Sequence, residues 1–238
     1  MPKGTLYLIP VTLGDDEAFG DVLPAEVLGI ARALDTFVVE DERSARRFLA
    51  AIKTSKPVRE LELLTLNEHT QDKELPALLA PLLAGKDIGI MSEAGCPGIA
   101  DPGARLVALA HRHSIKVKPL VGPSSILLAL IASGLDGQRF SFLGYLPAEK
   151  AARIQKLKDI ESRSRKGDET QIFIETPYRN QYMFEDILAN CQAHTRLCIA
   201  TNLTLDMESI QTKSIAEWKK AVAPGLHKQP TVFLLLAS

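Results

Sequence analysis

A loop of twelve residues, SEAGCPGIADPG at positions 92–103, joins an apolar segment typical of a buried β-strand to a segment with helical spacing. This order constrains the fold because helices join the strands in open α/β sheets. The three glycines and two prolines of the loop hold an irregular backbone that can approach a small molecule closely. Glu93 and Asp101 add oxygen acceptors. An ordinary tight turn is the alternative interpretation.

A second glycine turn, VGPSS at positions 121–125, follows another strand-like run and precedes a long apolar helix. Ligands in open α/β sheets bind beyond the carboxyl ends of the strands, so two such loops predict a shared ligand cleft. The hydroxyls of Ser124 and Ser125, with the first amides of the helix, are the expected ligand contacts.

Apolar strand-like runs alternate with helical runs along the first half of the chain, which predicts a largely parallel sheet. We expect strands at residues 6–11, 36–39, 61–66, 87–91 and 116–120, and helices at 22–34, 43–53, 76–84, 104–112 and 126–133. Farther along, we expect strands at residues 140–143, 171–175, 197–202 and 231–236, and helices at 149–163 and 180–191. The prediction is an α/β protein of two α/β domains, residues 1–120 with a mainly parallel sheet and residues 121–238 with a mixed sheet.

The charges of the chain are nearly balanced, with 28 Lys and Arg residues against 29 Asp and Glu residues. No overall basic field indicates a nucleic acid or an acidic membrane as the partner. An RNA partner would need a local patch, for which Arg43, Arg46, Arg47 and the basic run at residues 153–166 are candidates. The alternative for that run is a solvated helix surface.

The cysteines Cys96, Cys191 and Cys198 have neither the spacing of a zinc site nor a C-x-x-C pair, and the histidines are scattered, so no metal site is expected. Unpaired cysteines are typical of a reducing compartment. The N-terminal residues lack the basic segment followed by an apolar core that is typical of a signal peptide, and no run approaches the ~20 apolar residues of a membrane span. We expect a cytoplasmic protein without membrane association.

Polar residues follow three of the predicted strands and are candidates for acid–base chemistry. They are Glu40 after the second strand, Glu68 and His69 after the third, and Glu175 in the segment ETPYR at positions 175–179. A carboxylate or an imidazole at such a position can orient or deprotonate a substrate. Solvated loops and a helix N-cap are the alternatives. The dinucleotide, P-loop and G-x-S-x-G motifs are absent.

Five segments, in one order, resemble the tetrapyrrole methylase superfamily of S-adenosylmethionine-dependent methyltransferases. They are GTLYLIP at 4–10, EDER at 40–43, SEAGCPG at 92–98, GPS at 122–124 and IETPYR at 174–179. Within the superfamily the chain is most similar to the branch that methylates a ribose 2′-hydroxyl of small-subunit (16S) ribosomal RNA. Many members of that branch carry a small additional C-terminal domain, which we expect this chain to lack.

The resemblance implies that S-adenosylmethionine binds in a cleft between the two α/β domains of a homodimer and leaves as S-adenosylhomocysteine. By position, the cofactor contacts would be Leu13, Glu93, Cys96, Ser124 and Ser125, completed by backbone near Thr176, Asn202 and Thr231. Several positions depart from the usual pattern. Glu93 and Cys96 occupy positions where the family usually has Asp and Thr. Segments 11–15 and 201–204 differ from the usual sequences Ile-Gly-Asn-Leu and Arg-Glu-Leu-Thr.

The leading functional hypothesis is therefore RNA methylation, with the general base among Glu40, Glu68, His69 and Glu175. RNA or the ribosomal subunit would then be the partner. Methylation of a tetrapyrrole or another small molecule is the alternative, which the short length and the balanced charge of the chain permit. The altered loop positions motivate a third hypothesis, a protein that binds S-adenosylmethionine without turnover.

Overall fold

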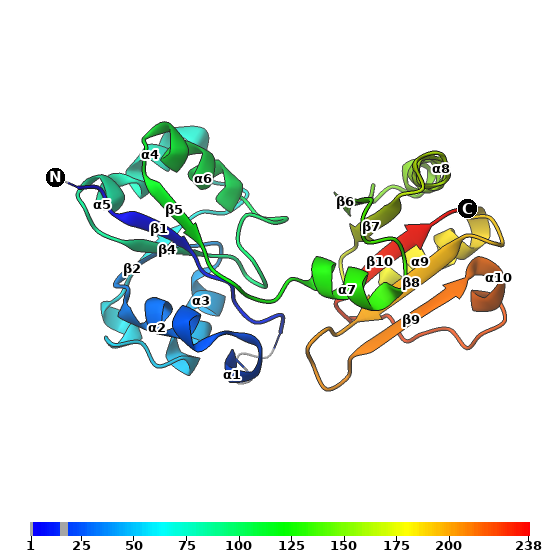
Figure 1. The fold of residues 1–238 in the computed structure, drawn as a ribbon, viewed down its shortest axis with the longest axis horizontal. Helices are drawn as coiled ribbons and strands as arrows, with labels where there is room; N and C mark the ends of the chain where they lie inside the picture. The colour runs from blue at the N-terminus through cyan, green and yellow to red at the C-terminus, as the bar shows by residue number, and fades with distance from the viewer. Residues whose placement is uncertain (1, 15–18) are drawn as a thin grey trace. The chain divides into compact units, whose positions relative to one another are not determined.

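The computed structural model describes residues 2–14 and 19–238, and it divides into two compact units, Met1–Ser124 and Ser125–Ser238. Each unit combines one five-stranded sheet with helices (Figure 1). This confirms the predicted α/β class. The division lies four residues after the predicted boundary at residue 120.

The sheet of the first unit is parallel throughout, with the strand order β3-β2-β4-β1-β5. The strands are β1 (Thr5–Leu8), β2 (Thr36–Val39), β3 (Glu62–Thr65), β4 (Ile88–Met91) and β5 (Lys116–Pro119). Because every strand runs the same way, the loops that follow the five strands all begin at one edge of the sheet.

Helices cover both faces of this sheet (Figure 1). On β2, Phe37 and Val39 join one apolar cluster while Val38 joins the other, as the alternation of side chains along a strand requires. The first cluster includes residues of α2 (Ala25–Ala33) and α3 (Glu42–Ala51). The second includes residues of α4 (Leu75–Leu78), α5 (Ala80–Leu83) and α6 (Gly103–Arg112). The shorter elements are α1 (Phe19–Val22), η1 (Val58–Glu60) and η2 (Asp72–Glu74).

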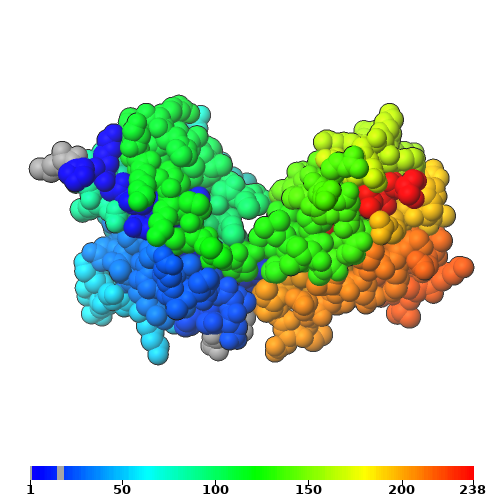
Figure 2. Space-filling view, in the orientation of Figure 1, coloured from blue at the N-terminus to red at the C-terminus, as the bar shows by residue number. Residues whose placement is uncertain are grey.

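The sheet of the second unit is mixed, with the order β6-β7-β10-β8-β9. Its strands are β6 (Phe140–Tyr145), β7 (Thr170–Ile174), β8 (Arg196–Thr201), β9 (Ser209–Ser214) and β10 (Thr231–Leu236). Only the β6–β7 pair among these is parallel. The helices are α7 (Ser125–Ser133), α8 (Lys150–Gly167), α9 (Asn180–Asn190) and α10 (Ile215–Trp218). The atoms of α8, yellow-green in Figure 2, lie on the outer surface of this unit.

Several elements differ from the sequence expectations: the helix predicted at residues 22–34 is divided into α1 and α2, and α10 was not predicted. The helix predicted at residues 76–84 is divided at Leu79 into α4 and α5, and Pro81, which has no amide hydrogen to donate, lies in the second of them. The helix α8 extends beyond its predicted end at residue 163 to Gly167, and it is capped by Asp168, whose φ is +49°. The edge strand β9 was not predicted, because its sequence, SIQTKS, is largely polar.

The loop expected after the first strand falls partly on residues 15–18, which lie outside the described part of the chain. Within the described part, no helix is both long enough and apolar enough to cross a membrane.

Candidate functional site

Three loops of the first unit are bonded together at the carboxyl edge of the parallel sheet. The amide of Val11, after β1, donates to the carbonyl of Gly95, after β4, at 2.9 Å. The thiol of Cys96 donates to the carbonyl of Pro123, after β5, at 3.3 Å. The predicted contacts Leu13, Cys96 and Ser124 therefore belong to loops that touch one another.

Glycine is required where these loops approach most closely. A Cβ atom on Gly122 would lie 2.3 Å from the ring carbons Cβ and Cγ of Pro10, far inside van der Waals contact. Gly95 has a φ of +72°, and a Cβ there would lie 3.2 Å from Cδ2 of Leu13. Gly95 and Gly122 thus bring backbone segments of the protein together, whereas the role predicted from the sequence was a close approach of the backbone to a small molecule.

Glu40 follows β2 and lies beside the loop that follows β4. Its Oε2 accepts a hydrogen bond from the amide of Glu93 at 3.1 Å. Partial burial raises the pKa of Glu40, and the negative charges of Asp101, Glu93 and Asp41 raise it further against the lowering effect of that hydrogen bond. A carboxylate with a raised pKa is a stronger base than an ordinary glutamate.

Asp101 stabilises the loop at residues 92–103 from within. Its two carboxylate oxygens accept hydrogen bonds from the amides of Gly98, at 2.6 Å, and Gly103, at 2.5 Å. Burial raises the pKa of Asp101 despite these bonds. Since both oxygens are engaged by the loop backbone, Asp101 shapes the loop rather than offering a free acceptor, which differs from the interpretation based on the sequence.

Cys96 has a half-buried side chain. Burial raises the pKa of its thiol, so the group stays protonated at neutral pH and is a poor nucleophile. It contributes a weak hydrogen-bond donor that its neighbour Pro123 already accepts.

The structure places Glu68 and His69 in an exposed turn after the edge strand β3. Their side chains are 85% and 84% exposed and lie 3.6 Å apart. The turn is closed by Asn67, whose Oδ1 accepts from the amide of His69 at 3.0 Å. Neither residue contacts the bonded loops among the contacts described for the chain, which is the geometry expected of a solvated loop.

In the second unit, Glu175 follows β7 and is buried with Arg179. Its Oε1 accepts from Nη2 of Arg179 and from the amide of Thr176, both at 2.6 Å. The side chain of Glu175 is fully buried whereas that of Arg179 is 38% exposed. The ion pair therefore closes the turn at the start of α9, and Glu175 is already neutralised by a cation.

Gln229 connects this turn to the two other loops that contain predicted cofactor contacts. Its backbone carbonyl accepts from Nδ2 of Asn180 at 2.6 Å and from Oγ1 of Thr231 at 2.9 Å, and its side-chain oxygen accepts from Nδ2 of Asn202. The amide of Asn202, whose φ is +50°, donates to the carbonyl of Pro230 at 3.0 Å. Thr176, Asn202 and Thr231 thus share one bonded cluster.

Three buried polar atoms of this cluster have no hydrogen-bond partner within the described residues. They are Oε2 of Glu175, Nε of Arg179 and Oδ1 of Asn180. A buried polar group without a partner costs about 1–3 kcal/mol, so such a concentration indicates a place where a polar ligand or water binds. We name Glu175, Arg179, Asn180, Asn202 and Gln229 the polar cluster of the second unit.

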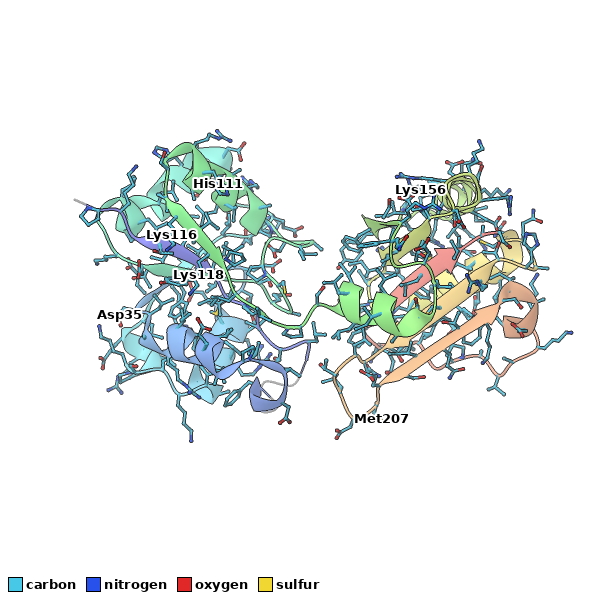
Figure 3. The ribbon with its side chains drawn as sticks, in the orientation of Figure 1. Asp35, His111, Lys116, Lys118, Lys156 and Met207 are labelled. Atoms are coloured by element: carbon cyan, nitrogen blue, oxygen red, sulfur yellow. The ribbon has the colours of Figure 1, made fainter. Side chains whose placement is uncertain are left out.

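Sequence reasoning missed Asn180 and Gln229. The only signal for Gln229 is its position directly before Pro230 and the last strand, and nothing in the sequence pairs it with residues 49 and 27 positions earlier. Met207, a loop residue labelled in Figure 3, also contacts the cluster, because its backbone carbonyl accepts a hydrogen bond from Nδ2 of Asn202 at 3.3 Å.

The arginines that the sequence suggested for a local RNA-binding patch have different environments. Arg153 is buried against Asp186, with Nη2 and Oδ2 2.6 Å apart, so it is a structural ion pair and not part of an RNA-facing surface as the sequence suggested. Arg46 pairs with Glu42 on α3 at 3.0 Å. No group of three or more His, Cys, Asp or Glu residues in the described part of the chain could hold a metal ion.

Comparison with known proteins adds the following. The chain matches the family described as Tetrapyrrole (Corrin/Porphyrin) Methylases over residues 5–219. It is 35% identical over 238 residues to the Ribosomal RNA small subunit methyltransferase I of Vibrio cholerae, covering 99% of this chain and 78% of that protein. It is 33% identical over 215 residues to the protein of the same name from Escherichia coli O157:H7, covering 90% and 71%.

Solved structures are similar in fold. The crystal structure of the methyltransferase CobJ has a TM-score of 0.63 at 17% identity, covering 100% of this chain and 95% of that one. The cobalt precorrin-4 methyltransferase CbiF has a TM-score of 0.61 at 16% identity, covering 98% and 94%. At this identity the two structures show the fold alone.

Proposed function

Since the chain belongs to the tetrapyrrole (corrin/porphyrin) methylase family, we propose that it is an S-adenosylmethionine-dependent methyltransferase that modifies a ribose 2′-hydroxyl of small-subunit ribosomal RNA. The observation that carries the proposal is its identity of 35%, over 99% of its length, with a protein named for that class of substrate. Apart from Gly4, the five motifs of the RNA-modifying branch lie within the matched residues 5–219.

The residues of the two units fit a cofactor of this kind. S-adenosylmethionine supplies an electrophilic methyl group on a sulfonium and carries an amine, a carboxylate, ribose hydroxyls and an adenine. The free Oε2 of Glu175 and Oδ1 of Asn180 accept hydrogen bonds, and Nε of Arg179 donates one. These three atoms match the hydroxyl, amine and ring-nitrogen groups of a nucleoside. In the first unit, Ser124 supplies a further hydroxyl.

Glu40 is the best placed of the four candidate bases. Its pKa is raised by burial, and it lies at the carboxyl edge of the sheet beside the loop of residues 92–103. Glu175 is neutralised by Arg179, and Glu68 and His69 are exposed and paired with each other. We assign Glu40 the task of accepting a hydrogen bond from the ribose hydroxyl and then its proton.

The remaining catalytic contribution of the protein is positioning. Methyl transfer is an in-line displacement, so holding the two reactants in line supplies much of the acceleration. The bonded loops at Val11, Gly95 and Pro123 are suited to this role, because their mutual hydrogen bonds limit their movement.

The proposal also covers the oligomeric state of the protein and the cellular compartment in which it acts. On α7, Leu127 and Ile131 are 52% and 76% exposed and lie one helical turn apart. Exposed apolar side chains at this spacing are typical of a helix that packs against a partner, and we propose a homodimer that uses them. The reaction would take place in the cytoplasm, where the chain's three cysteines remain reduced.

The test is methyl transfer to ribosomal subunits. Purified protein is incubated with S-adenosylmethionine labelled on the methyl group and with small subunits from a strain lacking this methyltransferase. The expected result is label in the small-subunit RNA, in a nucleotide whose 3′ phosphodiester resists alkaline hydrolysis, as 2′-O-methylation requires. Label in a tetrapyrrole precursor and none in RNA would establish the alternative. Binding of S-adenosylhomocysteine without label in any cell fraction would establish a protein without turnover.

A further inference from the structure

The helix α8 carries an excess of positive charge, although the positive and negative charges of the whole chain nearly balance. It carries seven of the 28 Lys and Arg residues and two of the 29 Asp and Glu residues, which leaves 21 basic against 27 acidic residues elsewhere. Arg153 and Glu161 of this helix are buried. Its exposed surface therefore presents six cations against a single carboxylate, Asp159.

The cations on one side of α8 line up along the helix axis. Lys156, Arg163 and Lys166 are separated by seven and three residues, a spacing that returns to the same side of an α-helix over about 15 Å. Figure 3 labels Lys156 on this helix. Within the described residues, neither Lys156 nor Lys166 has a salt-bridge partner among those found for the chain.

A hollow lies beside this side of the helix. It has a volume of about 780 Å³, and its charged and aromatic lining consists of Arg139, just before β6, Phe140, Arg163 and Lys166, together with the carboxylates Asp159 and Glu169. Phe140 is 40% exposed. We name Arg139, Phe140, Lys156, Arg163 and Lys166 the α8 basic surface.

The two guanidinium groups of the surface are held by ion pairs and, for Arg163, also by a hydrogen bond of 3.3 Å to Oγ of Ser141. Arg139 contacts Asp168 at 3.1 Å, and Arg163 contacts Glu169 at 3.3 Å, and both arginine side chains are 61% exposed. The Arg139–Asp168 pair is exposed at both partners and contributes little free energy, so phosphate can replace that carboxylate, whereas the side chain of Glu169 is only 21% exposed. Arginine also binds phosphate with two parallel hydrogen bonds.

We propose that the α8 basic surface binds the backbone phosphates of the RNA substrate, an inference that rests on the proposed function. The line of cations follows a polyanion over several phosphates, which a small anion would not need. Phe140 adds an aromatic ring at the hollow, and a ring beside cations is typical of surfaces that bind unpaired nucleotides. The surface belongs entirely to the second unit, whereas Glu40 belongs to the first, so we assign the surface the task of holding the substrate.

The experiment compares three substitutions on the α8 basic surface with three substitutions on the first unit. The test variant combines Lys156→Gln, Arg163→Gln and Lys166→Gln. The control combines Lys86→Gln, Arg112→Gln and Lys116→Gln, which removes the same charge from exposed residues of the first unit. These control residues lie before β4, at the end of α6 and at the start of β5, so they belong to the sheet edge opposite the ligand loops.

The expected result is a rise of roughly tenfold or more in the KM for small subunits in the test variant, with kcat changed less than twofold. The slope of log binding constant against log salt should become shallower by about 2, since each lost contact with single-stranded RNA removes about 0.7. Affinity for S-adenosylhomocysteine should not change. The control variant should match the wild type in all three measurements.

The outcomes separate this inference from the proposed function. If the wild type methylates RNA and the test variant has the same KM and salt slope, the α8 basic surface does not bind RNA, while the proposed function stands. An equal loss in the control variant would also overturn the inference, since net charge alone would explain it. If the wild type transfers no methyl group to RNA, the proposed function itself fails. Should the test variant not fold, the pair Lys156→Gln and Lys166→Gln gives the same comparison, with an expected slope change of about 1.4.

Discussion

The amide nitrogen of Glu93 lies 3.1 Å from Oε2 of Glu40 and donates a hydrogen bond to it. The bond joins the loop after β4 to the residue that follows β2; the two strands are neighbours in the sheet, while the two bonded residues are 53 positions apart in sequence. It holds one carboxylate oxygen of Glu40 in place and leaves Oε1 available for a substrate.

Replacing Glu40 by Gln should lower kcat by roughly 10²–10⁴-fold, because the amide keeps an acceptor for the Glu93 amide but cannot take a proton. Methyl transfer to small subunits under saturating cofactor measures this. Glu42→Gln on α3 is the matched control, since it removes the same charge two residues away. Full activity of the Glu40→Gln enzyme would assign the base to another residue.

The same substitution should make the protein more stable at neutral pH. The pKa of Glu40 is raised above its ordinary value of 4.5, chiefly by burial and further by nearby carboxylates, so the folded state is penalised once Glu40 is ionised. The penalty is absent below the unfolded-state pKa and is complete above the raised folded-state pKa. Urea midpoints of the variant should therefore exceed those of the wild type at pH 7.5 and converge with them near pH 4. A constant difference across this range would contradict the assignment.

Glu175→Gln should destabilise the second unit by about 1–3 kcal/mol, because it leaves the Arg179 guanidinium without its buried anion. It should also weaken S-adenosylhomocysteine binding, by about tenfold for a lost hydrogen bond to a charged group. Thermal unfolding and calorimetry measure the two effects. Glu185→Gln on the exposed surface of α9 is the control and should change neither. A stability loss with unchanged cofactor affinity would limit Glu175 to a structural role.

Two glycines of the first unit should respond to alanine in opposite ways. In Gly122→Ala the new Cβ would lie 2.3 Å from the ring carbons of Pro10, so we expect a loss of about 1–3 kcal/mol and weaker cofactor binding. Gly29 lies inside α2 with nothing within 4 Å of a built Cβ, and Gly29→Ala should stabilise the protein by about 0.5–1 kcal/mol. Urea unfolding of both variants tests the pair. Equal effects would show that the loops after β1 and β5 can separate freely.

Arg153→Ala should cost about 3–5 kcal/mol, because Asp186 would remain buried without its cation. Lys156→Ala, one turn along the same helix but exposed, should change stability by less than about 0.5 kcal/mol. Replacing both Arg153 and Asp186 by apolar residues should recover much of the loss. A small effect of Arg153→Ala would mean that water reaches Asp186.

Most helices and strands could be predicted because their signals are local. The β2 sequence TFVV is buried throughout and three of its four residues are apolar, and the helix that follows has a buried stripe of Ala45, Phe48 and Leu49 at helical spacing. The strand β9 could not be predicted in this way. It is an edge strand whose polar side chains reach solvent, and it forms only because β8 offers it hydrogen-bond partners.

The candidate site was predictable in part. The glycine-rich loops and Glu40 were identified because parallel strands bring their carboxyl ends to one edge, a rule that needs only the order of elements. Gln229 was missed because its three contacts come from residues 180, 202 and 231, and two of these are far away in the sequence.

The α/β class, the order of most elements and the loops that belong to the family could be predicted from the amino-acid sequence, since they follow from side-chain periodicity and from motifs that are local in the chain. Which charged side chains are buried and which are exposed depends on how the segments pack. Arg153 and Lys156 are both cations on α8, yet one is neutralised by Asp186 and the other is exposed. The physical reason is that the environment of a charge depends on packing between distant segments, which a single residue's identity does not encode.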